Sequence, residues 1–184
     1  MNKDGIFGRD RIVIMKDNLS YLRKKSIQTI FKDFKRYQKS YIFQSLLATS
    51  AIFTALLLLN IQKRPIIVAS IGATAFIVFA MPKDVTAKSR NVIGGHLVGL
   101  FCGSLCALIP HSTFLPSILV YSFAVGLATF IMLVVNAEHP PAAGTALGIV
   151  ITGFSLSASI GVITGAIVLS LIHHFAKSHL RDLV

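Results

Sequence analysis

The most unusual stretch of the sequence is the tetrapeptide Glu-His-Pro-Pro at residues 138–141, which interrupts a long apolar region. Glu138 is the only acidic residue between positions 85 and 181. An ionisable side chain inside a membrane or at its edge is costly, and it therefore points to function. We expect Glu138 to pair with Arg90 or His139, and His139 to titrate near neutral pH and to gate or couple proton movement. The alternative is an interfacial turn stabilised by a salt bridge.

Two prolines mark the starts of short helices. Pro65 and Pro140 fit the first turn of a helix, where a missing N–H costs nothing. His139 should lie just outside its helix, because the residue before a proline is held extended. Helix amino ends carry unpaired N–H groups and partial positive charge, which favour anions. The two amino ends are expected to enter from opposite sides and point toward a shared centre.

Hydroxyl donors lie along these two short helices, on Ser70, Thr74 and Thr145. Together with the helix amino ends, they would suit a small, weakly hydrated anion. The alternative is that each hydroxyl bonds back to a carbonyl of its own helix. Gly72 and Gly144 would let the backbone come near the anion.

The remaining histidines and cysteines show no arrangement typical of catalysis. His96 should face protein, where it either contributes to transport or bonds to a neighbouring backbone group. Six histidines without a carboxylate cluster do not make a metal site. There is no nucleophile–base pair, phosphate loop or paired carboxylate, so we expect neither an enzyme nor a cofactor. Cys102 and Cys106 are expected to be buried thiols.

The composition indicates a membrane protein. The chain has 184 residues, of which 54% are hydrophobic and 14% charged, with 18 Lys and Arg against 7 Asp and Glu. Eleven of the basic residues precede residue 41, and residues 41–176 contain only five. So few charges cannot cover an ordinary soluble surface, which excludes a soluble enzyme, a disordered tail and a nucleic-acid-binding domain. The net charge of +11 is a signal of membrane topology.

Proline and polar residues divide this region into six helical segments, at about 41–60, 65–82, 91–109, 114–135, 140–153 and 157–175. The second and fifth are short for a membrane span. Six spans leave 16 of the 18 basic residues in the inner regions 1–40, 83–90, 136–139 and 176–184. We therefore predict an all-α, multi-pass protein of the inner (plasma) membrane with both termini cytoplasmic. Residues 41–176 form the transmembrane domain and residues 177–184 a cytoplasmic tail.

The two halves of the transmembrane domain show the same order of segments: a long helix, a short helix that begins at a proline, and a glycine-rich helix. This order predicts a 3+3 inverted repeat. Residues 70–75 resemble residues 142–147, so that Gly72 corresponds to Gly144, and Gly-xxx-Gly recurs at residues 95–99 and 161–165. Interrupted short segments at matching positions of inverted repeats point to a transporter binding site. The small-xxx-small spacing also suits close helix packing, including a homodimer contact.

Residues 1–40 form a basic amphipathic segment. From Leu19 apolar residues recur at helical spacing with basic residues between them. Such a helix lies on an anionic leaflet, or packs on a partner or a second copy.

Residues 136–147, Asn-Ala-Glu-His-Pro-Pro-Ala-Ala-Gly-Thr-Ala-Leu, resemble the signature of the HPP family of integral membrane proteins. Residues 70–75 and 90–96, with Pro82 between them, match the same pattern. The resemblance covers about residues 41–175. Family descriptions assign four membrane helices, against the six expected here. The resemblance implies nitrite transport, and its motif positions are Ser70, Gly72, Arg90, Asn91, Gly94, Gly95, His96, His139, Pro140, Pro141, Gly144 and Thr145.

We therefore predict a channel or secondary transporter for a small monovalent anion, with nitrite as the leading candidate. Arg90 and His139 would attract the anion at the inner mouth. Pro65, Glu138, Pro140 and Pro141 would gate or shape the path. The alternative is a membrane sensor or scaffold that binds a partner or anionic lipid through its basic amino-terminal helix. The expected partners are thus a small inorganic anion, the bilayer and a second copy, and no nucleic acid.

Overall fold

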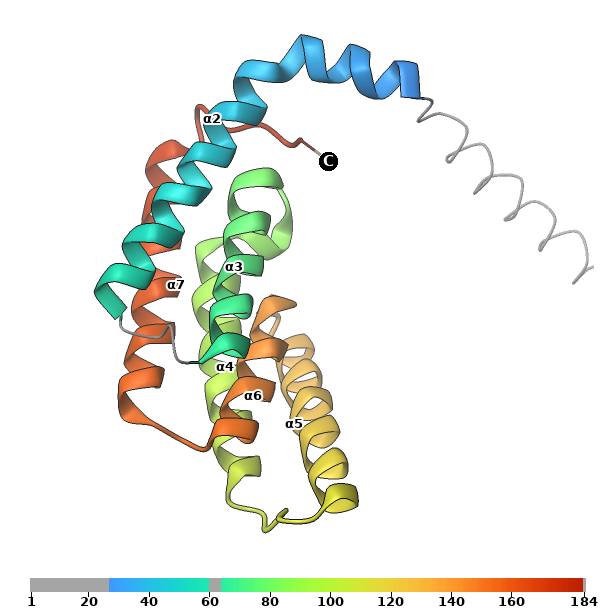
Figure 1. Cartoon of the computed structure of the whole chain (residues 1–184), viewed down its shortest axis with the longest axis vertical. Helices are drawn as coiled ribbons and strands as arrows, with labels where there is room; N and C mark the ends of the chain where they lie inside the picture. Colours follow the sequence, from blue (N-terminus) through green and yellow to red (C-terminus); the bar gives the residue numbers. More distant parts are fainter. Residues whose placement is uncertain (1–26, 60–63, 184) are drawn as a thin grey trace, which may run out of the picture. The chain divides into compact units, whose positions relative to one another are not determined.

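The computed structural model describes residues 27–59 and 64–183. Over these residues the chain forms six α-helices and one short 3-10 helix, with no strand (Figure 1). They are α2 (Ile27–Leu59), α3 (Pro65–Ala80), η1 (Val85–Ala87), α4 (Ser89–Ala107), α5 (Phe114–Val134), α6 (Pro141–Thr152) and α7 (Leu156–Ala176). The predicted all-α fold with six helical segments is confirmed. The predicted helical pattern from Leu19 up to residue 26 lies outside the described residues.

The chain divides into two units, residues 1–42 and residues 43–184. The described part of the first unit is the start of α2. Its basic side chains are exposed, namely Lys32, Lys35, Arg36 and Lys39. The Phe34 and Tyr41 rings stack with their centroids 6.0 Å apart. This segment therefore combines exposed positive charge with aromatic surface.

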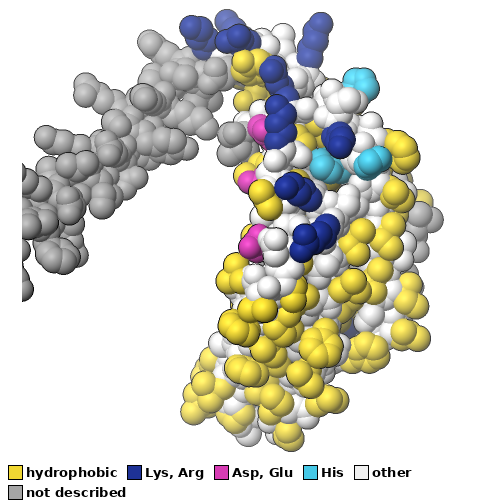
Figure 2. Space-filling model, turned by 180° about the vertical axis from the view of Figure 1, so that it is seen from behind, with side chains coloured by type: hydrophobic (Ala, Val, Ile, Leu, Met, Phe, Trp, Pro, Cys, Tyr) yellow, Lys and Arg dark blue, Asp and Glu magenta, His cyan; other side chains and the backbone are white. Residues whose placement is uncertain are grey.

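Three helical stretches among the described residues are long and apolar enough to cross a membrane: Phe34–Leu57 within α2, α5 and α7. Helices α3 and α6 are also apolar but have only 16 and 12 residues. At about 1.5 Å per residue, α6 is about 18 Å long, against about 30 Å for the hydrocarbon core. The prediction of a short second and fifth segment is confirmed. Hydrophobic side chains cover most of the face of residues 43–184 shown in Figure 2, as lipid contact requires.

Helices α3 and α6 lie side by side and antiparallel. Ile67, near the start of α3, lies against Gly148 toward the end of α6. Ser70 bonds to Thr145, farther back along α6. Next to the amino end of α3, Arg64 Nη1 donates to Thr152 Oγ1 over 2.8 Å. Helix α6 therefore runs along α3 from near its middle to its amino end.

The expectation that the amino ends of these helices point at a shared centre is wrong, because antiparallel packing places them at opposite ends of the pair. The amino end of α6 also lacks free donors. Pro140 and Pro141 have no N–H, and the next two N–H groups, of Ala142 and Ala143, donate to the carbonyls of His139 and Pro140. Side-by-side packing buries Ile67 and Ile71 of α3 with Ile149 of α6, which end-to-end packing would leave exposed.

A glycine stripe on α4 lets α6 approach closely. A Cβ added to Gly95 would come 2.6 Å from the Cβ of His139, and one added to Gly103 would come 2.6 Å from the Ala146 carbonyl oxygen. Gly99, between them, faces the Ala142 carbonyl. The spacing thus serves packing within one chain, as small residues do where hydrophobicity cannot drive helix association.

Helices α2 and α7 and the carboxyl-terminal tail all bond to the carboxyl end of α3 or to the residue pair that follows it. His173 Nε2 of α7 donates to the Pro82 carbonyl over 3.0 Å, and the Leu183 N–H donates to the carbonyl of Ala80 over 2.9 Å. Gln44 of α2 donates to the Phe79 carbonyl, at the carboxyl end of α3. These bonds hold the carboxyl-terminal tail against the end of α3.

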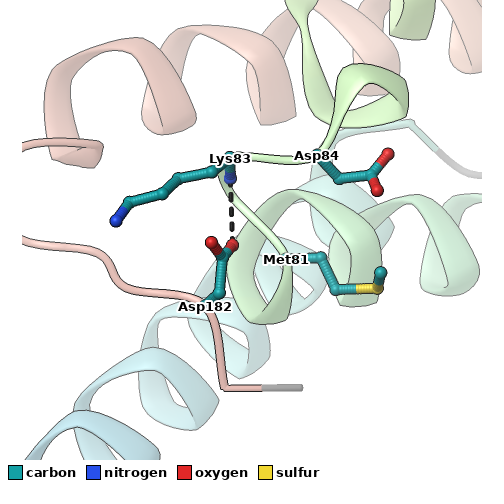
Figure 3. A pocket seen from close by; sticks show the side chains of 4 residues that line it. All are labelled: Met81, Lys83, Asp84 and Asp182. Atoms are coloured by element: carbon teal, nitrogen blue, oxygen red, sulfur yellow. Dashed lines mark hydrogen bonds between the residues drawn. The ribbon is translucent and has the colours of Figure 1, made fainter.

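A small pocket of about 290 Å³ opens at this end, lined by Met81, Lys83, Asp84 and Asp182 (Figure 3). In it the Lys83 N–H donates to Asp182 Oδ1 over 3.1 Å. The basic side chains of this unit on the face in Figure 2 gather toward the same end. This clustering follows the charge pattern from which the inner side was predicted.

The inverted repeat stays a prediction. Gly72 and Gly144, which the repeat would equate, have different surroundings. A Cβ on Gly72 would meet open space, whereas one on Gly144 would lie 3.5 Å from Ser70 Cβ. Gly161 and Gly165 of α7 are buried, like Gly95 and Gly99 of α4.

Candidate functional site

Five buried polar side chains meet between α3, α4 and α6. Each is at most 4% exposed, and they are Ser70, Thr74, His96, His139 and Thr145. Burying a polar group without a partner is costly in an apolar bundle. These side chains avoid that cost by bonding to one another and to three backbone carbonyls.

Each helix brings its residues to the cluster by simple periodicity. Ser70 and Thr74 are four residues apart and therefore share one face of α3. Thr145 lies one turn into α6, level with Ser70. His96 lies on α4 next to Gly95, whose missing side chain leaves room for His139. The extended stretch before Pro140 brings His139 from the α5–α6 connection.

Thr74 is the centre of the cluster. Its Oγ1 lies 2.9 Å from His96 Nε2 and 2.9 Å from His139 Nε2, and 3.0 Å from the Ser70 carbonyl oxygen. The two imidazole rings meet edge to face with their centroids 5.2 Å apart. One hydroxyl group therefore links two histidines from different elements.

The second half of the cluster runs from His96 toward α6. His96 Nδ1 lies 2.9 Å from Thr145 Oγ1, which lies 2.8 Å from Ser70 Oγ. Ser70 Oγ in turn donates to the Pro141 carbonyl over 2.6 Å. Both nitrogens of His96 therefore face hydroxyl groups.

His139 is held from the other side by the α3–α4 loop. Its Nδ1 lies 2.9 Å from the Thr86 carbonyl oxygen. A carbonyl only accepts, so Nδ1 carries a proton. Asp84 Oδ1 accepts from the Thr86 N–H over 2.8 Å and from its hydroxyl over 2.7 Å, which fixes that carbonyl. These two bonds hold the pKa of Asp84 below its usual range.

The other predicted site residues lie outside the cluster. Arg90 Nη2 donates to the Val135 carbonyl over 3.1 Å, at the carboxyl end of α5. Asn91 Nδ2 donates to the Glu138 carbonyl over 3.2 Å. Both side chains therefore hold the stretch that carries His139. The expected pairing of Arg90 with Glu138 is replaced by these bonds to carbonyls.

Gly72, Gly144 and Pro65 contribute no polar atom to the cluster. Gly144 lies beside Ser70, but Gly72 faces a groove between α2 and α3. Pro65 begins α3 at the opposite end from His139. Pro140 and Pro141 adjoin the cluster, and Pro141 supplies a carbonyl to it.

A pocket of about 210 Å³ lies next to the cluster, between α5 and the start of α6. It is lined by Thr129, Met132, Leu133, Glu138, His139, Pro140 and Ala143. Glu138 is half-buried here, and His139 belongs both to the lining of this pocket and to the cluster. This pocket is the nearest approach to the buried side chains among those described.

Sequence reasoning missed two backbone groups and two anchoring side chains. The carbonyls of Thr86 and Pro141 end the cluster, yet residue types carry no signal for a backbone acceptor. Gln44 and His173 donate to the backbone carbonyls of Phe79 and Pro82, at the carboxyl end of α3. Their polar type within apolar helices is the signal that could have found them. Cys102 and Cys106 are buried, unpaired thiols as predicted.

The cluster's chemistry depends on its composition. It contains no carboxylate, so a bound cation would find no negative charge. Its hydroxyls and imidazoles are donors that can turn toward an acceptor, and only protonation of a histidine gives it charge, which is positive. The only formal charge that these five side chains can acquire is therefore the positive charge of a protonated histidine.

Comparison with known proteins gives a family. The model of the HPP transmembrane region matches residues 35–180. The chain is also similar to two transmembrane proteins of Dictyostelium discoideum, with 33% identity over 82 residues and 32% over 89. These matches cover 45% and 48% of this chain, and 29% of each relative's length.

No solved structure matches the chain. The family match includes every residue of the buried cluster and the whole Glu-His-Pro-Pro stretch. Several apolar helices long enough to span a bilayer agree with it. The chain is a multi-pass membrane protein that belongs to the HPP transmembrane family.

Proposed function

We propose that this protein moves a small monovalent anion across the membrane, with nitrite as the leading candidate. The observation that supports this most is the buried cluster itself: five polar side chains and no carboxylate, within an apolar bundle. Intramembrane polar groups are expensive and mark substrate pathways by default. The family resemblance supports nitrite among small anions.

The anion is bound by exchange of hydrogen bonds. In the described conformation the cluster side chains satisfy one another, so an entering anion must replace some of those bonds. The hydroxyls of Ser70, Thr74 and Thr145 rotate freely enough to donate to it. The imidazole N–H groups add donors that strengthen when the ring is charged.

The pocket beside His139 is the entrance to the cluster. Displacing the His139 ring joins the pocket to the space between Thr74 and Thr145. Along the glycine stripe of α4, α6 packs against small residues and not against interlocked side chains. We therefore propose that α6 can shift along α4 when the His139 ring moves. Arg90, at the inner end, adds positive charge to the approach.

Flux measurements in proteoliposomes test the proposal. We expect uptake of nitrite, and graded uptake of nitrate, formate and chloride. Thr74→Val removes the central hydroxyl at nearly constant shape and should abolish uptake. Thr54→Val is the matched control, because Thr54 is exposed on α2 and bonds only to the Ser50 carbonyl of its own helix. No flux of any of these anions, or equal loss in both variants, would refute the proposal.

A second candidate function is supported by the exposed basic start of α2. Lys32, Lys35, Arg36 and Lys39 offer charge for anionic lipid or an acidic partner. A sensor or scaffold would need these residues and not the cluster. Changing all four to Gln should then abolish partner binding while Thr74→Val has no effect, which is the reverse of the pattern expected for transport.

A further inference from the structure

In the buried cluster, more pairs of polar atoms lie within hydrogen-bonding distance than there are protons to form the bonds, when both histidines are neutral. Seven pairs lie within bonding distance: three at Thr74 Oγ1, two from Ser70 Oγ, one between His96 and Thr145, and one between His139 and the Thr86 carbonyl. Each bond needs one proton. Three hydroxyls and two neutral imidazoles supply five, so two pairs stay without a proton.

We propose that His96 and His139 share one additional proton through the hydroxyl of Thr74, and that this pair is the protein's proton-binding site. With one added proton, six of the seven pairs form, in an unbroken series of donors. The series starts at the Thr86 carbonyl and runs through His139, Thr74, His96, Thr145 and Ser70 to the Pro141 carbonyl. Only the bond from Thr74 to the Ser70 carbonyl is missing.

The proton has two equivalent positions. When His139 carries it, Nε2–H donates to Thr74, whose own hydroxyl donates to His96 Nε2. A transfer moves the His139 Nε2 proton to Thr74 Oγ1 while the Thr74 proton moves to His96 Nε2. The charge passes from one imidazole to the other, Thr74 stays neutral, and its hydroxyl now donates to His139. The number of hydrogen bonds stays at six.

A second added proton is opposed by charge. It would fill the seventh pair but place two cations with ring centroids 5.2 Å apart in a buried site. No carboxylate within the cluster offsets the repulsion between the two cations, because Asp84 and Glu138 lie outside the cluster. Asp84 bonds to Thr86, and Glu138 lines the pocket outside. One proton is therefore the favoured load.

The elements packed around the cluster supply no other titratable group that faces it. Helices α3 and α6 carry none in their sequences. Arg90 of α4 donates to the Val135 carbonyl, and His173 of α7 to the Pro82 carbonyl. The other titratable side chains of α4, α5, α7 and the α3–α4 loop are Cys102, Cys106, Tyr121, His174, Lys83 and Lys88.

A shared proton would set the stoichiometry of transport, and this consequence rests on the function proposed above. An anion that accepts a bond from a charged imidazole stabilises the protonated pair. Proton and anion then enter and leave together, one to one, and the step carries no net charge. The proton gradient then adds to the anion's own gradient as a driving force.

Nitrogen-15 NMR of histidine-labelled protein in nanodiscs tests the proton site without any anion. We expect the His96 and His139 signals to change together in one step. Thr74→Ser should keep the joint step and Thr74→Val should split or remove it. Independent steps in the wild type, or two rings that stay neutral throughout the range in which imidazole titrates, would overturn the proposal.

Flux under an imposed proton gradient tests the coupling. With protein-free liposomes subtracted to remove diffusion of the neutral acid, we expect anion accumulation toward the alkaline side and loss of this response in Thr74→Val. Anion flux that ignores the gradient would overturn the coupling and leave the proposed function standing. Joint titration of the rings without any anion flux would support the proton site and refute the proposed function.

Discussion

At the scale of single residues, Thr74 connects the two histidines of the buried polar cluster. Its hydroxyl touches two histidines and a carbonyl within 3.0 Å. Both rings come from other elements, α4 and the α5–α6 connection. A single oxygen therefore holds three parts of the chain together, and its loss leaves imidazole nitrogens buried without partners.

Thr74→Val should lower the free energy of unfolding, whereas Thr74→Ser should not. A lost buried bond costs on the order of 1 kcal/mol, even where a membrane lets the unfolded state find other partners. Chemical unfolding in detergent micelles measures both variants. Equal stability of the Val and Ser variants would show that the hydroxyl bonds contribute nothing.

Asp84 predicts a pH dependence of the loop that holds His139. Its carboxylate accepts two bonds from Thr86, which lower its pKa in the folded state. It therefore stabilises the fold above its unfolded pKa of about 4, and this contribution is lost as the pH falls through the lower, folded pKa. The difference in melting temperature between wild type and Asp84→Ala should be largest near neutral pH and vanish in acid. A difference that grows in acid would contradict this sign.

The residues of the cluster could be named from the sequence, but their arrangement could not. The sequence indicated hydroxyl donors along the two short helices, on Ser70, Thr74 and Thr145. It also singled out His96 within an apolar segment and His139 before Pro140. The prediction that the amino ends of the two short helices point at a shared centre was wrong. The hydrophobicity and proline pattern of the sequence does not say whether two short helices meet end to end or lie side by side. Arg90 and Asn91 share the motif yet bind carbonyls outside the cluster.

At the scale of elements, the contact between α4 and α6 determines the site. A Cβ added to Gly99 or Gly103 of α4 would meet a backbone carbonyl of α6, and one added to Gly95 would meet the Cβ of His139 just before α6. That contact positions His139 and Thr145 opposite His96. The glycine spacing predicted close packing correctly, although it did not say which helix would be the partner.

Gly103→Ala should destabilise the protein and Gly126→Ala should not. A Cβ at Gly103 would lie 2.6 Å from the Ala146 carbonyl oxygen, whereas one at Gly126 of α5 meets nothing within 4 Å. Overpacking costs about 1–3 kcal/mol, while alanine in place of an unconstrained helical glycine gains up to about 1 kcal/mol. Thermal melts of the two variants measure the contrast. Similar melting temperatures would mean that α6 does not rest on the α4 glycines.

At the scale of the whole molecule, stretches that were predicted to lie on the inner side of the membrane meet at one end of residues 43–184. The α3–α4 loop, the α5–α6 connection and the carboxyl-terminal tail are joined by hydrogen bonds at one end. Arg64 meets Thr152 at the other end. The placement of both termini on the cytoplasmic side stays a prediction.

Thiol labelling tests that topology. Cys102 and Cys106 are buried, so a membrane-impermeant reagent should report only introduced cysteines. We expect Lys88→Cys and Lys177→Cys to react from the cytoplasmic side and Ser157→Cys, at the exposed start of α7, to react from the other side. Reaction of Lys88→Cys and Ser157→Cys from the same side would contradict the six-segment topology.

The most direct test of the central claim is the initial rate of nitrite uptake into proteoliposomes that contain wild-type protein, His139→Ala or Thr54→Val. If the buried cluster is the path of the anion, wild type and Thr54→Val take up nitrite equally and His139→Ala does not. Uptake by His139→Ala at the wild-type rate would show that the anion crosses elsewhere or that the cluster serves only to hold the helices together.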